Sequence, residues 1–488
     1  MASSPLAPIP RLVGRTPEQE QLARAHGSGR PELIAVHGRR RIGKTYLIRT
    51  YFARDLCFEL TGVRDATRTH QLKSFAHALE SVTGFKHATP DDWPEAFQEL
   101  TRYLESQLRD GARKVVFFDE LPWLAGKKSG FLPAFDHFWN TWGTRQKGLI
   151  VVICGSAASW MIAKVLHQKG GLHNRITCSI PLQPFDLSEI DAYLKAEGVV
   201  LDQKQTIELA MAIGGVPYYL NYVRKGCSAA QNIDALFFAP NAPLRDEFNL
   251  VFAALFDHHE RHLKVIRALA RKRSGLSRTD LIRETKLETG GAFTTILDEL
   301  ESSGFICRMM PFGRKTKDPC FRLIDELSLF HLRWVEGRRG LGDGGHTWLH
   351  HRLTPAGRAW SGYAFENICL RHAPKIKNAL GIAGVQTALS SWAHQAENKE
   401  DTGAQIDLLF DRSDGVISVC EMKFSEEEFV IDKAYARELR TKLEVFRRAT
   451  GTRKAVFLVL VTTHGIKPNQ YQAELVQNLV TATALFVP

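Results

Sequence analysis

A short motif near the start of the chain has the residue types and spacing needed to bind phosphate. Residues 38–45 read GRRRIGKT, which fits GxxxxGK[ST], and they stand between the apolar run 33–36 and a helical pattern. In this context glycines let backbone N–H groups and a helix N-terminus face a triphosphate. Lys44 is expected to reach the β- and γ-phosphates, and the Thr45 hydroxyl to bind Mg²⁺. The residues expected to line the nucleotide are Gly38, Arg39, Arg40, Arg41, Ile42, Gly43, Lys44, Thr45 and Tyr46.

Polar residues that suit phosphate hydrolysis follow two later apolar runs. The string KVVFFDE at 114–120 ends in two carboxylates. Asp119 is expected to hold Mg²⁺, mostly through water, and Glu120 to polarise the attacking water. The run LIVVICGS ends at Ser156, which either senses the γ-phosphate or simply begins a loop. Arg175 either contacts phosphate, in its own subunit or in a neighbour, or is a surface arginine.

A second set of charged residues converges in the last third of the chain. Residues 405–411 and 416–423 are strand-like runs joined by the turn 413–415, whose last residue is glycine. A three-residue hairpin turn of this kind pairs Asp407 with Glu421 across the two strands. Lys423 then lies on the same face, two residues along. Two carboxylates on one sheet face can bind a hard divalent cation, and the lysine can steady a phosphate or the attacking water.

The elements that must position these residues follow from the distribution of apolar runs. Runs at 32–36, 57–60, 114–118, 148–153 and 176–182 alternate with longer amphipathic stretches. This alternation predicts an α/β fold with a parallel sheet covered by helices on both faces. Residues 183 to about 250 lose these runs and are expected to be helical. A second α/β pattern follows the glycine-rich linker that begins at residue 337.

The segment between the helical part and the linker is rich in Lys and Arg. Residues 276–306 predict a helix–turn–helix followed by a strand, and residues 308–322 a hairpin with Arg314, Lys315 and Lys317 at its tip. A helix with a basic hairpin would suit duplex DNA, without sequence preference. Against this, the presumed recognition helix exposes the acidic residues Asp298, Glu299 and Glu301, so an interdomain packing role is equally open.

Composition narrows the class of protein. The 488 residues hold 64 Lys and Arg against 53 Asp and Glu, and the net charge of +11 suits a polyanionic partner or a merely basic surface. The eight cysteines form no CxxC pair, which argues against structural zinc and fits a reducing compartment. We therefore expect a cytoplasmic protein that does not cross a membrane, since no apolar run is long enough to span one.

These motifs together resemble the archaeal-type ATPase family, a P-loop group near the AAA+ and STAND ATPases. The strings that carry the resemblance are VGR near the start, GRRRIGKT, FFDE, the GS strand end, NRI followed by PLQPF, and GGVPYYL at 214–220. The run at 57–60, together with Glu120, favours this branch over GTPase-like proteins. The resemblance covers residues 11 to about 335 and implies ATP and Mg²⁺ as ligands, a helical lid and a winged helix. It also implies that Arg15 and Pro217 lie near the nucleotide.

The last part of the chain resembles the PD-(D/E)xK, or restriction-endonuclease-like, nuclease fold. Asp407 and the string EMK at 421–423 match the family pattern, although no proline precedes Asp407. The resemblance implies that Glu366, on the preceding helix, is an extra acid beside Asp407 and Glu421 in a metal site. Lys433, Tyr435 and Lys442 on the next helix either line a DNA groove or are simply solvated. A degenerate domain with a structural carboxylate–lysine cluster is the alternative.

We accordingly predict a P-loop core at 10–182, a helical lid at 183–254, a winged helix at 255–336, a linker at 337–348 and a nuclease-like domain at 349–488. The leading hypothesis is an ATP-hydrolysing enzyme that acts on DNA through a Mg²⁺-dependent C-terminal site. The alternative is a nucleotide-controlled switch, in which ATP governs assembly into a homo-oligomer and the C-terminal domain is not catalytic. A metabolic kinase is disfavoured, because Glu120 suits hydrolysis better than transfer to a metabolite.

Overall fold

The computed structural model describes residues 12–109, 111–126, 128–156, 158–166, 171–313, 319–337, 347–396 and 401–488. The chain folds as two compact units, Met1–Pro184 and Phe185–Pro488. The first unit ends two residues beyond the predicted P-loop core. Most of the predicted linker at 337–348 and the basic tip formed by Arg314, Lys315 and Lys317 lie outside the described residues.

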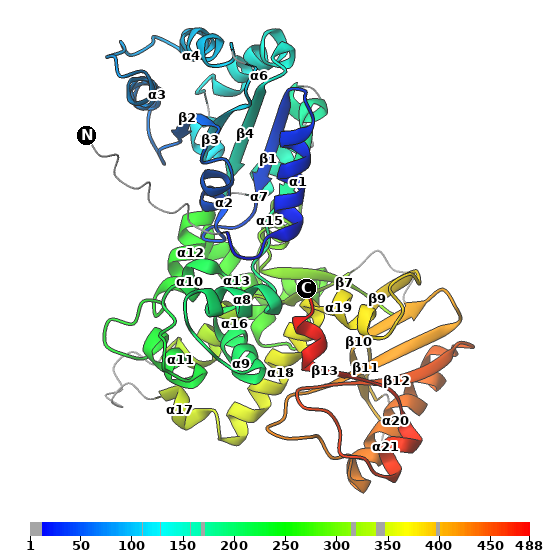
Figure 1. Ribbon diagram of the computed structural model, residues 1–488. Helices are drawn as coiled ribbons and strands as arrows, with labels where there is room; N and C mark the ends of the chain where they lie inside the picture. The colour runs from blue at the N-terminus through cyan, green and yellow to red at the C-terminus, as the bar shows by residue number, and fades with distance from the viewer. Residues whose placement is uncertain are drawn as a thin grey trace. The chain divides into compact units, whose positions relative to one another are not determined.

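The first unit is a five-stranded parallel sheet with helices on both faces (Figure 1). Its strands stand in the order β2-β3-β4-β1-β5. Their bounds are β1 Glu32–His37, β2 Leu56–Thr61, β3 Lys114–Asp119, β4 Leu149–Gly155 and β5 Cys178–Pro181. The helices are α1 Thr16–Gly27, α2 Lys44–Tyr51, α3 Arg68–Thr83, α4 Trp93–Gln107, α5 Leu121–Leu124, α6 Phe131–Thr141 and α7 Ala158–Met161, with short η1 Gly143–Arg145, η2 Ile162–Leu166 and η3 Gly171–Arg175.

The central strand β1 explains why its sequence is a continuous apolar run. Leu33 and Ala35 pack into the core formed with α3, α4 and α6, while Ile34 and Val36 pack into the core formed with α1 and α2. Successive side chains of a strand point to opposite faces, so a sheet covered on both sides has no polar alternation. The predicted α/β fold with a parallel sheet is confirmed.

One detail of strand order differs from the sequence pattern. The run at 57–60 lies between the phosphate motif and the acidic pair along the chain, but β2 is an edge strand. The strand inserted in space between β1 and β3 is β4, which pairs with both of them in parallel. The inserted strand is therefore the one that is followed by Ser156. The ends of β3, β4 and β1, which carry the predicted nucleotide residues, thus lie side by side.

The second unit contains a mixed sheet of eight strands in the order β13-β12-β11-β10-β9-β7-β8-β6. Their bounds are β6 Leu276–Ser277, β7 Ile306–Pro311, β8 Cys320–Leu323, β9 Thr387–His394, β10 Ala404–Arg412, β11 Val416–Lys423, β12 Ala455–Thr462 and β13 Val476–Thr481. The first three strands come from the predicted winged helix and the other five from the predicted nuclease-like domain. The two groups join where β7 pairs in parallel with β9, at Met310–Ser390 and Pro311–Ser391.

Helices precede and flank this sheet. The predicted lid holds α8 Leu187–Ala196, α9 Gln203–Ile213, α10 Pro217–Leu220, α11 Ala229–Phe237 and α12 Glu247–Leu255. The basic segment holds α13 His259–Ala270, α14 Arg278–Thr285, α15 Gly291–Ser302, α16 Glu326–Phe330 and η4 His331–Val335. The remainder holds α17 Thr347–His351, α18 Pro355–Arg371, α19 Ala373–Ala379, α20 Lys433–Thr450, α21 Gln470–Leu475 and η5 Ala482–Phe486. Among the described residues, no helix has the length and apolar character needed to cross a bilayer.

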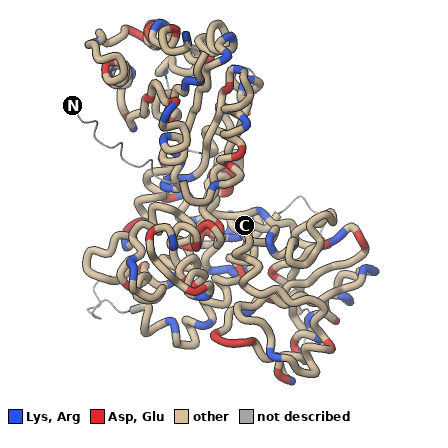
Figure 2. The backbone as a smooth tube through the Cα atoms, viewed as in Figure 1, with Lys and Arg blue, Asp and Glu red and all other residues tan. Residues whose placement is uncertain are grey.

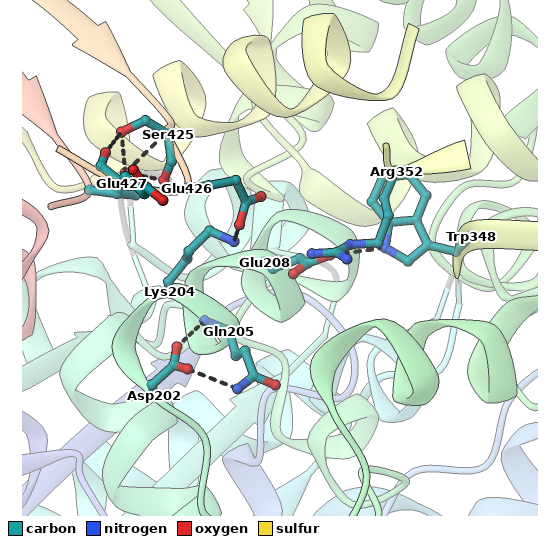
Figure 3. A network of polar contacts seen from close by, with 10 residues as sticks. Asp202, Lys204, Gln205, Glu208, Trp348, Arg352, Ser425, Glu426 and Glu427 are labelled. Atoms are coloured by element: carbon teal, nitrogen blue, oxygen red, sulfur yellow. Dashed lines mark hydrogen bonds and ion pairs between the residues drawn. The ribbon is translucent and has the colours of Figure 1, made fainter. Parts of the chain in front are cut away.

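The parts that sequence separates into lid, winged helix and nuclease-like domain share one hydrophobic core. Helix α9 lies at its centre, and all of its residues from Thr206 to Ile213 are buried. Polar contacts connect this helix to distant segments of the chain (Figure 3). Glu208 accepts hydrogen bonds from Trp348 and Arg352, and Lys204 pairs with Glu426 at 2.6 Å. A further core, which includes Trp392, Leu409 and Phe446, lies within the predicted nuclease-like domain, and the predicted subdivision of residues 183–488 stays a prediction.

A buried histidine fastens the lid to the C-terminal part. The Leu187 N–H, at the start of α8, donates to His372 Nε2 at 3.0 Å, and His372 Nδ1 lies 2.7 Å from the Ile368 carbonyl oxygen. Burial lowers the pKa of His372 from 6.5 to about 4, although the Ile368 hydrogen bond and Asp186 oppose this shift. The ring is therefore neutral, with Nε2 as the acceptor.

Acid is expected to destabilise the second unit through this histidine. Because its folded pKa lies below the unfolded value, the unfolded chain takes up the proton first as pH falls. The stabilising contribution is complete above pH 6.5 and is lost down to about pH 4. The loss amounts to roughly 3 kcal/mol in the free energy of unfolding. Chemical denaturation at several pH values should show this slope, and His372→Gln should flatten it while the exposed-site control His464→Gln keeps it.

Candidate functional site

The phosphate-binding motif forms a tight loop between β1 and α2 in the first unit. Gly38 has φ +148°, and a Cβ there would stand 2.3 Å from the Leu182 carbonyl oxygen and 2.6 Å from the Ile42 side chain. Only glycine fits this approach. Gly43, with φ +89°, is the N-cap of α2, so the loop turns its backbone toward the start of the helix. Loop and helix N-terminus together form the anion-binding arrangement that the motif predicts.

Two buried basic residues hold this loop. Lys44 is 6% exposed, and its ammonium donates to the carbonyl oxygens of Gly38 and Arg39, both at 2.9 Å. Arg15, which is 4% exposed, donates to the Ile42 carbonyl at 3.0 Å and to the Gln183 carbonyl at 2.5 Å. Arg15 therefore supports the loop from outside by binding its backbone. Pro217, the other residue that the resemblance implies near the nucleotide, lies in the second unit at the start of α10.

Thr45 and Asp119 meet at the expected magnesium position. The Thr45 hydroxyl donates to Asp119 Oδ2 at 2.7 Å, and Asp119 is buried at the end of β3. A hydroxyl and a carboxylate this close present adjacent oxygen ligands of the kind that Mg²⁺ prefers. The residues present therefore fit this cation.

Glu120 lies next to the sensor candidate Ser156. Glu120, the N-cap of α5, has φ +49°, a left-handed conformation that is uncommon for a residue other than glycine. Its Oε2 accepts from the Ser156 hydroxyl at 2.8 Å and from the Ser156 backbone N–H at 3.2 Å. Because β3 and β4 are neighbours, the acid and the serine are brought together by the sheet itself. Sequence patterns suggested both residues but not the contact between them.

The remaining predicted nucleotide residues occupy different settings. Tyr46 is 51% exposed on α2, Arg40 is exposed in the loop, and Arg39 is buried. Arg41 has φ +72°. Arg175 lies 3.6 Å from the carboxylate of Asp136 on α6, an acid of its own unit. The contact of Arg175 with phosphate stays a prediction.

The predicted hairpin in the second unit has the expected register. Leu408 pairs with Cys420 and Asp411 with Ile417, and the next pair in this register is Asp407 with Glu421. Gly415 in the turn has φ +85°, the left-handed conformation that the turn requires. Asp407 and Glu421 thus lie one position beyond the paired residues of this ladder, and their direct pairing stays a prediction.

Each of these acids is engaged by basic side chains. Asp407 Oδ1 lies 3.2 Å from the Arg322 guanidinium and accepts from Gln405 at 2.8 Å. Glu366, on α18, lies 3.4 Å from the same guanidinium. Glu421 is bound by Lys442 at 2.6 Å, by Lys423 at 3.0 Å and by the Tyr435 hydroxyl at 2.8 Å. Lys442 and Tyr435 thus contact the carboxylate itself, whereas Lys433 is the first residue of α20.

The pKa values of the acids reflect these neighbours. Burial raises the pKa of Glu366 to about 7, and the charges of Asp407 and Glu421 add to the rise while Arg322 opposes it. Burial also favours a raised pKa at Glu421, but Lys442 and Lys423 outweigh it and leave the pKa below its usual value. Asp407 and Glu421 thus both act on the protonation of Glu366.

As arranged, these residues do not form a metal centre. Among the residues that the structure describes, no group of three or more His, Cys, Asp or Glu side chains is placed to hold a metal ion. The oxygens of Asp407 and Glu366 face a guanidinium, and those of Glu421 face ammonium and phenol groups. A divalent cation would need the same oxygens free of these donors. The metal-ligand role of Glu366, Asp407 and Glu421 stays a prediction.

The sequence patterns did not identify Arg322 as a site residue. It lies on β8 between the buried residues Phe321 and Leu323 and is itself 2% exposed. The Tyr363 ring of α18 stacks on its guanidinium at 5.3 Å. A charged residue inside a short strand with buried neighbours is the signal that could have found it, because buried charges need partners.

The acidic residues expected to repel DNA are paired within the basic segment. Arg308 of β7 bonds Asp298 at 3.2 Å and Glu301 at 2.9 Å, and the buried His262 bonds Glu299 at 2.7 Å. These contacts anchor α15 to its neighbours and use part of the segment's positive charge internally. Lys and Arg are interspersed with Asp and Glu along both units (Figure 2). DNA contact by this segment stays a prediction.

The sequence is similar to known proteins. A family model described as an ATPase domain predominantly from Archaea matches residues 12–223. An uncharacterized protein of Methanocaldococcus jannaschii is 24% identical over 330 residues, which cover 66% of this chain and 69% of that protein.

Two solved structures are also similar. A Walker-type ATPase of Pyrococcus abyssi has 18% identity and a TM-score of 0.48, over 66% of this chain and 96% of that one. The Aeropyrum pernix ORC2 protein, in complexes with ADPNP and ADP, has 16% identity and a TM-score of 0.41, over 66% and 93%.

Proposed function

We propose that residues 12–223, which match the model of an ATPase domain predominantly from Archaea, bind ATP with Mg²⁺ and hydrolyse it. The observation that carries the proposal is the meeting of three strand ends at one edge of the sheet. There the loop after β1, the acids after β3 and the serine after β4 stand together, with Thr45 bonded to Asp119 and Glu120 bonded to Ser156.

Each residue has a defined task in this proposal. The loop N–H groups and Lys44 bind and orient the phosphates. To do so, Lys44 replaces its hydrogen bonds to the carbonyl oxygens of Gly38 and Arg39 with bonds to phosphate oxygens. Thr45 and Asp119 would hold Mg²⁺, which when bound neutralises charge that develops on the phosphates. Glu120 orients water and accepts its proton, and Ser156 holds the carboxylate until phosphate arrives.

The direct test is phosphate release by the purified full chain with ATP and Mg²⁺. A turnover that requires both components, and that EDTA abolishes, supports the proposal. Calorimetry with ATP or ADP gives the binding step separately. Folded protein that produces no heat with either nucleotide would rule out the assignment of the first unit.

A second candidate function is action on DNA through the second unit. The observation that favours it is the hairpin register, in which Asp407 and Glu421 lie at the end of the β10–β11 ladder, with Lys423 at 3.0 Å from Glu421. This pattern underlies the resemblance to PD-(D/E)xK nucleases. Because the carboxylates are engaged by Arg322 and by lysines, the site must rearrange before it resembles a working nuclease centre.

Plasmid DNA offered with Mg²⁺ and ATP tests this candidate. If the unit cleaves DNA, Asp407→Ala should remove cleavage and leave ATP turnover unchanged, because the two sites lie in different units. Glu438→Ala, at an exposed acid within α20, is the matched control. Asp432→Ala would not serve, because Asp432 caps α20. Intact plasmid under conditions of active ATP turnover would argue for the alternative.

That alternative is a nucleotide-controlled switch with a C-terminal domain that does not cut. The carboxylate cluster favours this alternative, because Arg322 of β8 already occupies Asp407, so the acid is not available to a metal. Light scattering with and without ATP would detect assembly into a homo-oligomer.

We place the protein in the cytoplasm as part of the same proposal, since all eight cysteines are free thiols.

A further inference from the structure

The carboxylate cluster of the second unit is balanced without any metal. Three acids, Glu366, Asp407 and Glu421, face three cations, Arg322, Lys423 and Lys442. All of these side chains are at most partly exposed, so their charges are weakly screened. Buried charges are tolerated when they are paired, and each of these acids has a basic partner within 3.4 Å. A divalent cation added to this cluster would make it strongly positive.

Arg322 is the member of the cluster that blocks the position between two acids. Its two terminal nitrogens divide between Asp407, at 3.2 Å, and Glu366, at 3.4 Å. The Tyr363 ring packs on the guanidinium, and the side chain is 3% exposed. A metal bound to the same oxygens at about 2.1 Å would lie within a few ångströms of a fixed positive charge. Guanidinium and metal therefore exclude each other.

The arginine comes from outside the strands that carry the acids. Asp407 belongs to β10, whereas Arg322 belongs to β8, which reaches that part of the sheet only through β7 and β9. The junction of β7 with β9 consists of two residue pairs, while β11 and β12 pair over eight. The strand pairing between the two segments is thus short, although Phe321 and Leu323, on either side of Arg322, are buried in the same hydrophobic core as Leu408 and Cys420.

We propose that Arg322 is a resident cation that keeps divalent metal out of the Glu366–Asp407 pair, so that the C-terminal site is metal-free while the β7–β8 hairpin is in place. The inference concerns the same site as the DNA candidate and deepens it with a form of regulation. Displacement of the hairpin would withdraw the guanidinium and leave both acids available to a hard divalent cation. Metal binding and hairpin docking then become competing states of one site.

A Mn²⁺ titration of the nucleotide-free full chain tests this inference, with bound Mn²⁺ read by electron paramagnetic resonance. Wild type and Asp407→Asn should bind Mn²⁺ alike, because Asp407 is not available in either protein. Arg322→Gln should gain one site that binds at least about tenfold more tightly than any site in wild type, since the closed state no longer competes. The double variant Arg322→Gln/Asp407→Asn should lose the gained site. Arg437→Gln, an exposed arginine of α20, is the matched control.

Thermal unfolding gives a second readout. Removing Arg322 leaves two acids without their partner, so Arg322→Gln should melt at a lower temperature than wild type, and Mn²⁺ should restore it. Arg322→Lys keeps the positive charge, so it should not gain the tighter Mn²⁺ site, and Mn²⁺ should change its melting temperature no more than that of wild type. Should the glutamine variant fail to fold, the comparison of wild type with Asp407→Asn decides alone, and coincident titrations support the inference.

Two results would overturn the inference. One is Mn²⁺ binding by wild type that Asp407→Asn abolishes, and the other is a folded Arg322→Gln that gains no site. Neither depends on catalysis. If Arg322→Gln binds Mn²⁺ but leaves plasmid intact, the DNA candidate fails and the arginine's role stands. If wild type cuts DNA while Arg322→Gln gains no Mn²⁺ site, the inference about Arg322 fails and the DNA candidate stands.

Discussion

Glu120→Gln should bind ATP as wild type does but hydrolyse it roughly 10²–10⁴-fold more slowly. The amide has nearly the shape of the carboxylate, and its oxygen can still accept the hydrogen bonds that Ser156 donates to Glu120 at 2.8 and 3.2 Å. What the amide lacks is a basic oxygen able to take a proton from water. Steady-state phosphate release measures the turnover, and calorimetry with ATP and Mg²⁺ measures the binding.

Glu105→Gln provides the control for charge, since Glu105 is exposed on α4 in the same unit. It should leave both turnover and binding unchanged. If Glu120→Gln turned over at the wild-type rate, the assignment of Glu120 as the base would be wrong, and another group would have to activate the water. A variant that loses ATP binding as well would instead indicate that Glu120 supports the loop.

Lys44→Ala should abolish detectable nucleotide binding, with an affinity loss of at least about 100-fold. Charge-assisted hydrogen bonds contribute about 1.5–3 kcal/mol each, and Lys44 is expected to supply one to each of two phosphates. The ammonium is already held inside the loop by two carbonyl oxygens, so it is preorganised to meet the phosphates. Calorimetry with ATP and with ADP gives the affinity.

Lys73→Ala, on the exposed side of α3, is the matched control and should bind normally. Circular dichroism and thermal melting would establish that Lys44→Ala is folded, since β1, α2 and their core do not depend on the ammonium. Retained affinity in a folded Lys44→Ala protein would contradict the phosphate-loop assignment. The proposed hydrolysis would then have no binding step.

The fold of the first unit could be predicted from sequence because its signals are local. A parallel sheet buried on both faces needs continuous apolar strands, and all five predicted runs became strands. The hairpin register was equally accessible, because turn length and Gly415 determine which residues oppose each other. The position of β4 between β1 and β3 was not accessible, since the order of strands in space does not follow their order along the chain.

The candidate sites show the same division. Thr45 and Asp119 were recognisable because motif residues at strand ends meet at one edge of the sheet. Arg322 was not, because its partners Asp407 and Glu366 lie 85 and 44 residues away and belong to other elements. Nothing in a strand reading CFRL indicates which carboxylates its arginine will meet. Long-range ion pairs depend on how whole elements pack, which residue spacing does not encode.

The central position of helix α9 bears on the order in which the chain matures during synthesis. Its buried surface is completed by Trp348, which lies 140 residues beyond its partner Glu208, and by η5, near the C-terminus, where Thr483 bonds Gln203 across 280 residues. At translation speeds of about 5–20 residues per second, α9 leaves the ribosome on the order of half a minute before its last neighbours do. The first unit has all of its strands by Pro181 and can fold early. The second unit must keep an apolar helix shielded until η5 emerges, a long interval in which exposed apolar surface favours aggregation.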